Sequence, residues 1–270
     1  TYDHEFIAAG GVVLTASIEH RGFTNAKVAE KFAREHFVNP DQVFVTGSSA
    51  GAYGAVVNSL SLLENVYPSS DFSVLGDAGN GVITQEFLVN DISKWGIEEN
   101  LPAWIPGLNI PLTELNMADL YVEAANTYPS ARFGTFTTAY DGGTGGQTGF
   151  FNVMREPTNP VQWQFWWNAS CDWNTEMLML NQRAIDGAPN YRAYVGSGSA
   201  HTTWGRNRVY TDTTGGVPTM VDWVSAMIDG RADWVNVIAD DFGVLLPGDP
   251  DPNPIQAPFT EDGRIDCSAP

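Results

Sequence analysis

The sequence predicts an α/β fold in which a mostly parallel sheet carries helices on both faces. Short apolar runs alternate with helical patterns along the chain, an order typical of parallel strands joined by helices. With 270 residues, 43% of them hydrophobic, the chain can fill one large core. No internal repeat or second core is visible, so we expect a single domain over residues 1–246 and an extended, proline-rich tail over 247–270.

The expected elements follow from the spacing of apolar residues and from capping and turn residues. In the first half we expect a buried strand at 12–16, a helix capped by Thr24 or Asn25 and ending near 37, a strand leading into Ser49, a helix to about 65 and a strand at 72–75. In the second half we expect a helix at about 113–126, a strand at 133–138, a helix at about 172–185, a strand at 191–195 and a closing helix at about 220–228.

The pattern breaks between residues 91 and 115, where large apolar residues alternate with prolines and glycines. Two interpretations stay open for this segment. It is either an excursion packed on the core or an aromatic-rich cap over a site, in which a residue such as Trp104 contacts an acyl group or a polymer. A second aromatic stretch, Trp163 with residues 165–167, is interpreted as helix core rather than as a ligand platform.

The charge balance excludes several classes of function. With 13 basic and 32 acidic residues the net charge is −19, which repels nucleic acids and anionic membranes. The lysines and arginines form no cluster that could bind phosphates, so nucleic-acid binding is not expected. The sequence contains no run of about 18 apolar residues, which is the length needed to span a membrane. The sequence contains no metal-ligand spacing, so we expect no metal site, and its glycine-rich run at 142–146 has no lysine that would indicate a phosphate-binding loop.

The two cysteines, Cys171 and Cys267, belong to no CxxC pair. They are either two buried free thiols or one disulfide that ties the C-terminal tail to the body of the protein. We favour the disulfide, which implies an oxidising compartment and therefore a secreted or periplasmic protein in mature or trimmed form.

One stretch organises the prediction of function: a β-rich run that ends in Gly47-Ser48-Ser49-Ala50-Gly51 and leads into a helical pattern. Strand, sharp turn and helix around Gly-x-Ser-x-Gly are typical of a nucleophile elbow, whose small residues let the serine Oγ project while strand and helix pack closely. Ser49 is therefore the candidate nucleophile, and the Ala50 N–H is the candidate oxyanion donor. The alternative is a chance Gly/Ser pattern in a loop.

A serine nucleophile needs a base. Of the four histidines, His4 and His36 are interpreted as surface residues. His20 follows a strand and can approach the site, but it precedes the serine and is misplaced for a base. His201 follows a strand through a Gly/Ser loop, which fits the order serine, acid, histidine of α/β-hydrolases, so it is the candidate base.

The base in turn needs a carboxylate that orients its ring. Asp141 is preferred, because it follows a strand and lies between Ser49 and His201 in the chain. Asp77, at the end of the strand after the elbow, is the alternative acid, or it orders the loop beside the elbow. The other residues expected to line the site are Ser48, Tyr53, Asp77, His20 and Trp104.

Several segments together resemble the bacterial branch of the pectin acetylesterase/Notum family of serine hydrolases. They are Glu19–Gly22, Val43–Gly54, Gly76–Gly79, Thr138–Asp141, Ser170–Trp173, Ser199–Thr202 and Val221–Val224. The resemblance implies an α/β-hydrolase-like fold, a triad of Ser49, Asp141 and His201, hydrolysis of carboxylic esters and no cofactor. The family carries a Gly-Gly-Gly segment upstream of the elbow that completes the oxyanion hole. We expect this chain to begin after it, since Gly10-Gly11 is too close to the elbow to replace it.

The function expected from these observations is that of an extracellular serine esterase. Its substrate would be an acylated polysaccharide that loses acetyl or other short acyl groups, or a small, aryl or polymer ester. A polyesterase, a lipase-like enzyme and a serine peptidase would use the same triad. The alternative from another class is a catalytically silent glycan- or ligand-binding module on the same fold.

Overall fold

A computed structural model describes residues 2–7, 11–155, 165–250 and 266–267 of the chain. The main sheet has five strands in the order β3-β4-β5-β6-β7, and every neighbouring pair is parallel. Its strands are β3 (Gln42–Ser48), β4 (Asp71–Asp77), β5 (Arg132–Thr138), β6 (Tyr191–Gly196) and β7 (Val237–Ile238). The predicted α/β fold with a mostly parallel sheet is confirmed, while the short strand β7 was not predicted.

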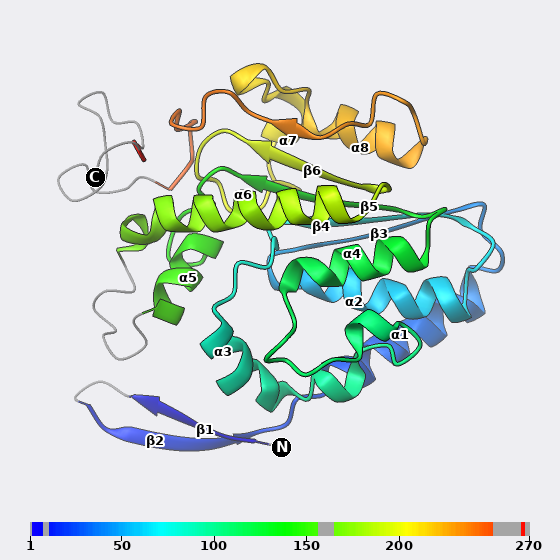
Figure 1. Cartoon of the computed structure of the whole chain (residues 1–270), viewed down its shortest axis with the longest axis horizontal. Coiled ribbons are helices and arrows are strands. Elements are labelled where there is room, and N and C mark those ends of the chain that lie inside the picture. Colours follow the sequence, from blue (N-terminus) through cyan, green and yellow to red (C-terminus); the bar gives the residue numbers. More distant parts are fainter. Residues whose placement is uncertain (1, 8–10, 156–164, 251–265, 268–270) are drawn as a thin grey trace.

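Helices cover both faces of this sheet (Figure 1). The helices are α1 (Gly22–His36), α2 (Ala50–Asn65), α3 (Gln85–Asn90), α4 (Met117–Thr127), α5 (Gln147–Arg155), α6 (Ser170–Gly187), α7 (Arg208–Thr211) and α8 (Met220–Ile228). Strand residues alternate between the two sides, as the pleat requires. Val74 and Phe133 join the core under α2 and α4, whereas Leu75 and Phe136 join the core against α8.

Local capping explains where several helices begin. The side chains of Asn116 and Thr219 accept hydrogen bonds from the backbone N–H groups of Ala118 and Asp222 and so cap α4 and α8. Helix α8 has the predicted bounds, but α4 begins later than predicted because Asn116 provides the cap. The predicted cap of α1 is wrong: Arg21 occupies the N-cap position and makes no side-chain capping bond.

The N-terminal segment, residues 11–38, differs most from its prediction. Strand β2 (Val13–Ile18) pairs antiparallel with β1 (Tyr2–Ile7) in a two-stranded sheet apart from the main one (Figure 1). All side chains of β2 are exposed, so the expected buried strand at 12–16 is wrong. Helix α1 follows with no buried residue. Of the sixteen large hydrophobic residues exposed in the described part of the chain, nine lie in this segment.

The segment from 91 to 115 forms three short 3₁₀ turns rather than longer elements. They are Ile92–Trp95, Glu98–Asn100 and Pro106–Leu108. Ile105 and Leu108 are fully buried in the core under α2 and α4, so the segment packs on the core. In the second aromatic stretch Trp166 and Trp167 are buried as predicted, in a 3₁₀ turn before α6, whereas Trp163 lies outside the described residues.

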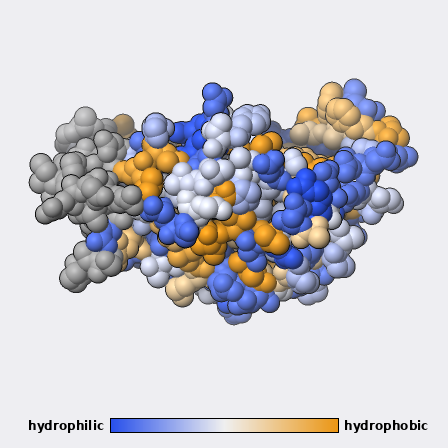
Figure 2. All heavy atoms as spheres, turned by 90° about the horizontal axis from the view of Figure 1, so that it is seen from above, coloured by the Kyte–Doolittle hydropathy of each residue, from blue (hydrophilic) through white to orange (hydrophobic). Residues whose placement is uncertain are grey.

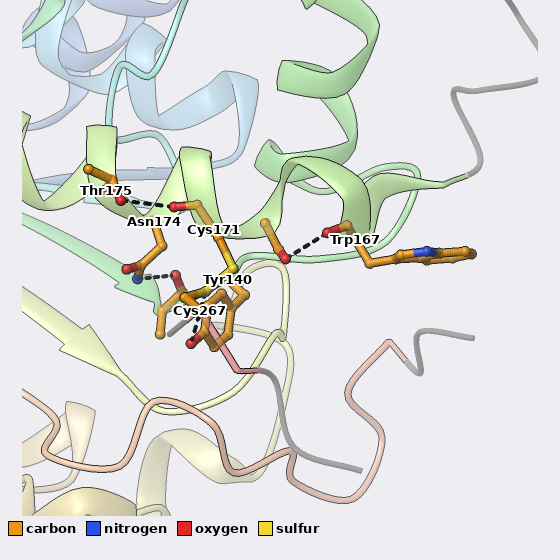
Figure 3. Close-up of a disulfide and its surroundings, with 8 residues drawn as sticks. Tyr140, Trp167, Cys171, Asn174, Thr175 and Cys267 are labelled. Atoms are coloured by element: carbon orange, nitrogen blue, oxygen red, sulfur yellow. Dashed lines mark hydrogen bonds between the residues drawn. A yellow bond between two sulfur atoms is a disulfide. The ribbon is translucent and has the colours of Figure 1, made fainter. Parts of the chain in front are cut away.

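The predicted disulfide between Cys171 and Cys267 is confirmed, with a Cα–Cα distance of 5.3 Å. Figure 3 shows that it joins the start of α6 to the C-terminal tail beside the ring of Tyr140, whose hydroxyl lies 3.8 Å from the sulfur of Cys267. Asn174 of the same helix donates a hydrogen bond of 2.8 Å to the carbonyl of Ala139. The tail is thereby tethered next to the loop that follows β5.

Within the described part of the chain, no helix is both long and apolar enough to cross a membrane. Figure 2 views the molecule from the side of α7 and α8 and shows a band of hydrophobic residues bordered by hydrophilic ones. Of the predicted tail, residues 251–265 and 268–270 lie outside the described residues.

Candidate active site

The ends of β3 to β6 and the loops that follow them form the carboxyl edge of the sheet. Ser49 follows β3 directly and Asp77 is the last residue of β4. Asp141 lies three residues after β5, and His201 lies five residues after β6. Because the strands are parallel, all four residues come to the same edge, where ligand sites of open α/β sheets are found.

Ser49 occupies a strained turn between β3 and α2. Its φ of 58° and ψ of −125° lie in a region that non-glycine residues rarely adopt. The turn requires small neighbours: a Cβ on Gly47 would lie 2.1 Å from the carbonyl oxygen of Gly51, and one on Gly79 would lie 2.4 Å from Cβ of Ala52. The Ser49 N–H donates a 2.8 Å hydrogen bond to the carbonyl of Asp77, which ties the turn to the next strand.

Ala50 begins helix α2, so its N–H is among the first backbone groups that have no partner inside the helix. The dipole of the helix favours negative charge at this end. Gly11 precedes β2, and no atom lies within 4 Å of the position that a Cβ on it would take. Gly10 lies outside the described residues. The elbow itself therefore supplies one backbone donor, the N–H of Ala50.

Asp141 and His201 form a direct pair, with 2.6 Å between Oδ1 and Nδ1. Asp141 is fully buried and also accepts hydrogen bonds from the Gln147 N–H at 2.9 Å and from the hydroxyl of Thr137 at 3.3 Å. An ionised carboxylate can only accept, so Nδ1 of His201 carries the proton and Nε2 is left as the acceptor of the ring.

The pKa values of this pair follow from burial and charge. Burial raises the pKa of Asp141, although the hydrogen bond from His201 opposes the shift. Burial alone would lower the pKa of His201. The hydrogen bond to Asp141 and the negative charges of Asp141 and Asp77 outweigh burial, so the pKa of His201 is raised above its usual value.

Asp77 has a different set of partners. Its fully buried carboxylate accepts hydrogen bonds from the Ser48 hydroxyl at 2.7 Å and from the Thr203 N–H at 3.1 and 3.2 Å. It also accepts from the Trp204 N–H at 3.5 Å. Asp77 thus joins the residue before Ser49 to the segment after His201, and Asp141 is the carboxylate that His201 contacts.

A cavity of about 580 Å³ opens beside Ser49. Tyr53 and Gln147 line it and are fixed to each other, because the Tyr53 hydroxyl donates to Oε1 of Gln147 at 3.0 Å and accepts from the Gly81 N–H at 3.1 Å. Burial raises the pKa of Tyr53, which keeps its hydroxyl protonated. The apolar part of the wall consists of Phe23, Val57, Ile83, Ile92, Trp95, Ile97, Met117 and Phe150.

The described residues include no group of three or more histidine, cysteine, aspartate or glutamate side chains that could hold a metal ion. Comparison with protein-family models, with curated proteins and with solved structures finds no match.

Three residues predicted to line the site have other positions. Ser48 lies beneath the turn, hydrogen-bonded to Asp77. His20 stacks on Trp95 of the cavity wall, with 6.0 Å between ring centroids. Trp104 lines a second, adjoining cavity instead. The part of the segment 91–115 that lines the main cavity is the stretch from Ile92 to Asn100, so the segment both packs on the core and borders the site.

Sequence reasoning missed two contributions to the site. Gln147 connects the cavity to Asp141, because its N–H donates to that carboxylate while its side-chain amide donates to the carbonyl of Ala78 at 2.8 Å. Besides the predicted Ala50 and Tyr53, the same face of α2 lines the cavity through Gly54, Val57 and Asn58. The spacing of three and four residues along this helix was the available signal, since such residues share a helix face.

Proposed function

We propose that this chain is a serine carboxylic ester hydrolase in which Ser49, His201 and Asp141 act as nucleophile, base and acid. One observation carries the proposal: the buried Asp141 lies 2.6 Å from the half-buried His201, at the same sheet edge as a serine held in a strained turn beside an apolar cavity. Nucleophile, base and orienting carboxylate are the three groups that acyl transfer to serine requires.

In the proposed mechanism the Ser49 hydroxyl attacks the carbonyl carbon of the ester while Nε2 of His201 takes its proton. Asp141 stabilises the imidazolium that forms, and the Ala50 N–H stabilises the oxyanion of the tetrahedral intermediate. The intermediate collapses to an acyl-enzyme, and the alcohol leaves with the proton from His201. A water molecule then attacks the acyl-enzyme while Nε2 of His201 takes its proton. His201 passes this proton to the Ser49 oxygen as the acid is released.

The chain order of Ser49, Asp141 and His201 supports an α/β-hydrolase-like fold for the parallel sheet. Together with the motif segments it supports membership of the pectin acetylesterase/Notum family. The disulfide between Cys171 and Cys267 supports secretion or export, because such bonds persist in oxidising compartments.

The volume and the apolar lining of the cavity favour substrate esters with a sizeable apolar part. About 580 Å³ with aromatic and aliphatic walls exceeds what an acetyl group needs and falls within the range of pockets for drug-sized ligands. Of the predicted substrates, aryl and polymer esters therefore suit the site better than acetylated polyuronates. The net charge of −19 would also repel polyuronates at low salt.

The test compares wild type with Ser49→Ala on p-nitrophenyl butyrate and with a fluorophosphonate probe. We expect turnover by the wild type, a loss of about 10⁴-fold or more in kcat for the variant, and labelling at Ser49 alone. Ser69→Ala, which removes an exposed serine away from the site, is the control and should match the wild type.

Two outcomes would contradict the proposal. Turnover that survives in Ser49→Ala would assign the activity to another group. A wild type that neither turns over esters nor reacts with the probe would favour the silent binding module, because one backbone donor would then be too few for catalysis.

A further inference from the structure

Two cavities adjoin along one face of helix α2. The cavity beside Ser49 is lined by helix residues from Ala50 to Asn58, and a second cavity of about 250 Å³ is lined by Val57, Asn58, Ser61 and Asn65. Phe23, Val57, Asn58 and Asn100 line both, so the two form one groove. At 1.5 Å per residue, the groove extends about 16 Å along the helix from Ala50 to Ser61.

The two compartments of the groove differ in chemistry. The near compartment, beside Ser49, is mainly apolar. The far compartment carries polar side chains: Lys27, Asn58, Ser61, Asn65, Glu99 and Asn100 line it. Lys27 is already paired, since its ammonium group lies 2.7 Å from Glu30 and also contacts the hydroxyl of Ser61. The far compartment therefore offers hydrogen bonding without an unpaired positive charge from Lys27.

Three asparagines in the far compartment share one arrangement. The side-chain amide of each donates to the backbone carbonyl four residues earlier: Asn58 to Gly54 at 2.7 Å, Asn65 to Ser61 at 3.3 Å and Asn100 to Gly96 at 2.6 Å. Because a carbonyl can only accept, the amide nitrogen must face the backbone in all three, and Oδ1 must lie at the other end of the amide. Within the described part of the chain none of these three oxygens accepts a hydrogen bond.

Trp104 adds a fixed aromatic surface to the far compartment. Its indole N–H donates to the hydroxyl of Tyr128 at 2.8 Å, and that hydroxyl donates to Glu64 at 2.9 Å. The side chain is 44% exposed, so part of the ring is open to contact. Oriented acceptors beside an aromatic ring bind groups that combine hydroxyl donors with a carbon skeleton.

We propose that the far compartment is a subsite for a neutral, hydroxyl-bearing part of the substrate, whose apolar part lies beside Ser49. This inference rests on the proposed function, because it takes Ser49 as the reacting end of the groove. The substrate class is thus an amphipathic ester with a hydroxyl about 14 Å from Ser49, the distance along α2 to Asn58. A carboxylate is excluded, because Glu99 would repel it and Lys27 is already paired with Glu30.

The kinetic test compares p-nitrophenyl decanoate with p-nitrophenyl ω-hydroxydecanoate. For the wild type we expect kcat/KM to be about 3- to 10-fold higher for the hydroxylated ester, the worth of one or two neutral hydrogen bonds. Asn58→Leu should reduce this ratio to one or below. Asn126→Leu is the matched control, because Asn126 also donates to a backbone carbonyl, that of Gly187, but lies outside the groove.

Binding provides a readout that does not need catalysis. With Ser49→Ala, the dissociation constants of methyl decanoate and methyl ω-hydroxydecanoate are measured by tryptophan fluorescence, with and without Asn58→Leu. Preferential binding of the hydroxylated ester that depends on Asn58 supports the subsite, even if the wild type hydrolyses no ester. Equal rates and equal binding for the two esters, in a wild type that does hydrolyse them, would overturn the subsite and leave the esterase standing.

Discussion

The carboxyl edge of the sheet and the N-terminal segment place their side chains in opposite environments: polar groups are buried at the edge, whereas apolar residues are exposed in the segment. At the carboxyl edge, Asp77 and Asp141 are fully buried and each carboxylate oxygen accepts a hydrogen bond. In residues 11–38, helix α1 has no buried residue, and Phe32 and Val38 are 55% and 73% exposed.

An amphipathic pattern specifies that a helix forms, but it does not specify what the apolar face of that helix packs against. The apolar stripe of α1 predicts a helix, and a helix forms at residues 22–36. Most of the stability of a helix in a protein comes from packing of its apolar face, which the pattern of one segment cannot describe. Burial at the carboxyl edge instead comes from strands that lie far apart in the chain. We therefore expect substitutions in the two regions to have very different effects.

The largest effect is expected for Phe133→Ala in the central strand β5. Phe133 has no exposed surface and lies between β4 and β6, opposite Val74 and Tyr191. Its removal leaves a cavity between the sheet and its helices, so the free energy of unfolding should fall by about 3–5 kcal/mol. Urea denaturation measures the loss. A loss smaller than about 1 kcal/mol would mean that the sheet core is loosely packed.

The next largest effect is expected for a substitution of Asp77, and it is measured as a change in kcat and in the pH dependence of kcat/KM. Asp77→Asn keeps the size of the side chain but removes a negative charge near His201. The charges of Asp77 and Asp141 raise the pKa of His201, whereas the charge of Arg206 lowers it. His201 must be neutral to act as base, so activity is lost as the pH falls through its pKa. With that pKa lowered, the acid limb of kcat/KM should move to lower pH.

The same variant should lower kcat about 10- to 100-fold, since the amide disturbs the bonds that position the segments of Ser48 and Thr203. Asp71→Asn is the control, because Asp71 is the first residue of the strand that Asp77 ends and pairs with Arg132 near the surface. A variant with lower kcat but an unmoved acid limb would make Asp77 a purely structural residue.

Much of the fold could be predicted from the sequence because local signals carried it. Helices α2 and α8 end where their apolar spacing ends, and the strained turn at Ser49 is visible from its glycines. The two-residue strand β7 was missed because it has too few residues for any periodicity. The buried strand at 12–16 was wrong because an apolar run does not reveal which partner it meets.

The candidate site was predictable in its residues but not in its connections. The positions of Asp141 and His201 after strands favoured a pair, and the structure places them 2.6 Å apart. The hydrogen bonds between Asp77 and Thr203 join segments more than a hundred residues apart in the chain. The course of the groove depends on which segments lie beside one face of α2. Such tertiary contacts leave no trace in the spacing of one segment.

The smallest effect is expected for Phe32→Ala in helix α1, an exposed phenylalanine that contrasts with the buried Phe133. Phe32 is 55% exposed and its ring contacts only nearby residues of the same segment among the described aromatic rings, with centroids 4.0 Å from His36 and 6.4 Å from Phe37. Alanine is also the better helix former. The free energy of unfolding should therefore change by no more than about 0.5 kcal/mol, measured by urea denaturation beside Phe133→Ala.

The result of this substitution also reports whether the N-terminal segment is covered in solution. A loss above about 1.5 kcal/mol would mean that Phe32 is buried there, because an exposed ring cannot lose that much on truncation. If a second copy of the chain were the cover, the unfolding midpoint of the wild type would rise with protein concentration, and Phe32→Ala would abolish that rise. With a net charge of −19 opposing self-association, we expect the midpoint to be independent of concentration.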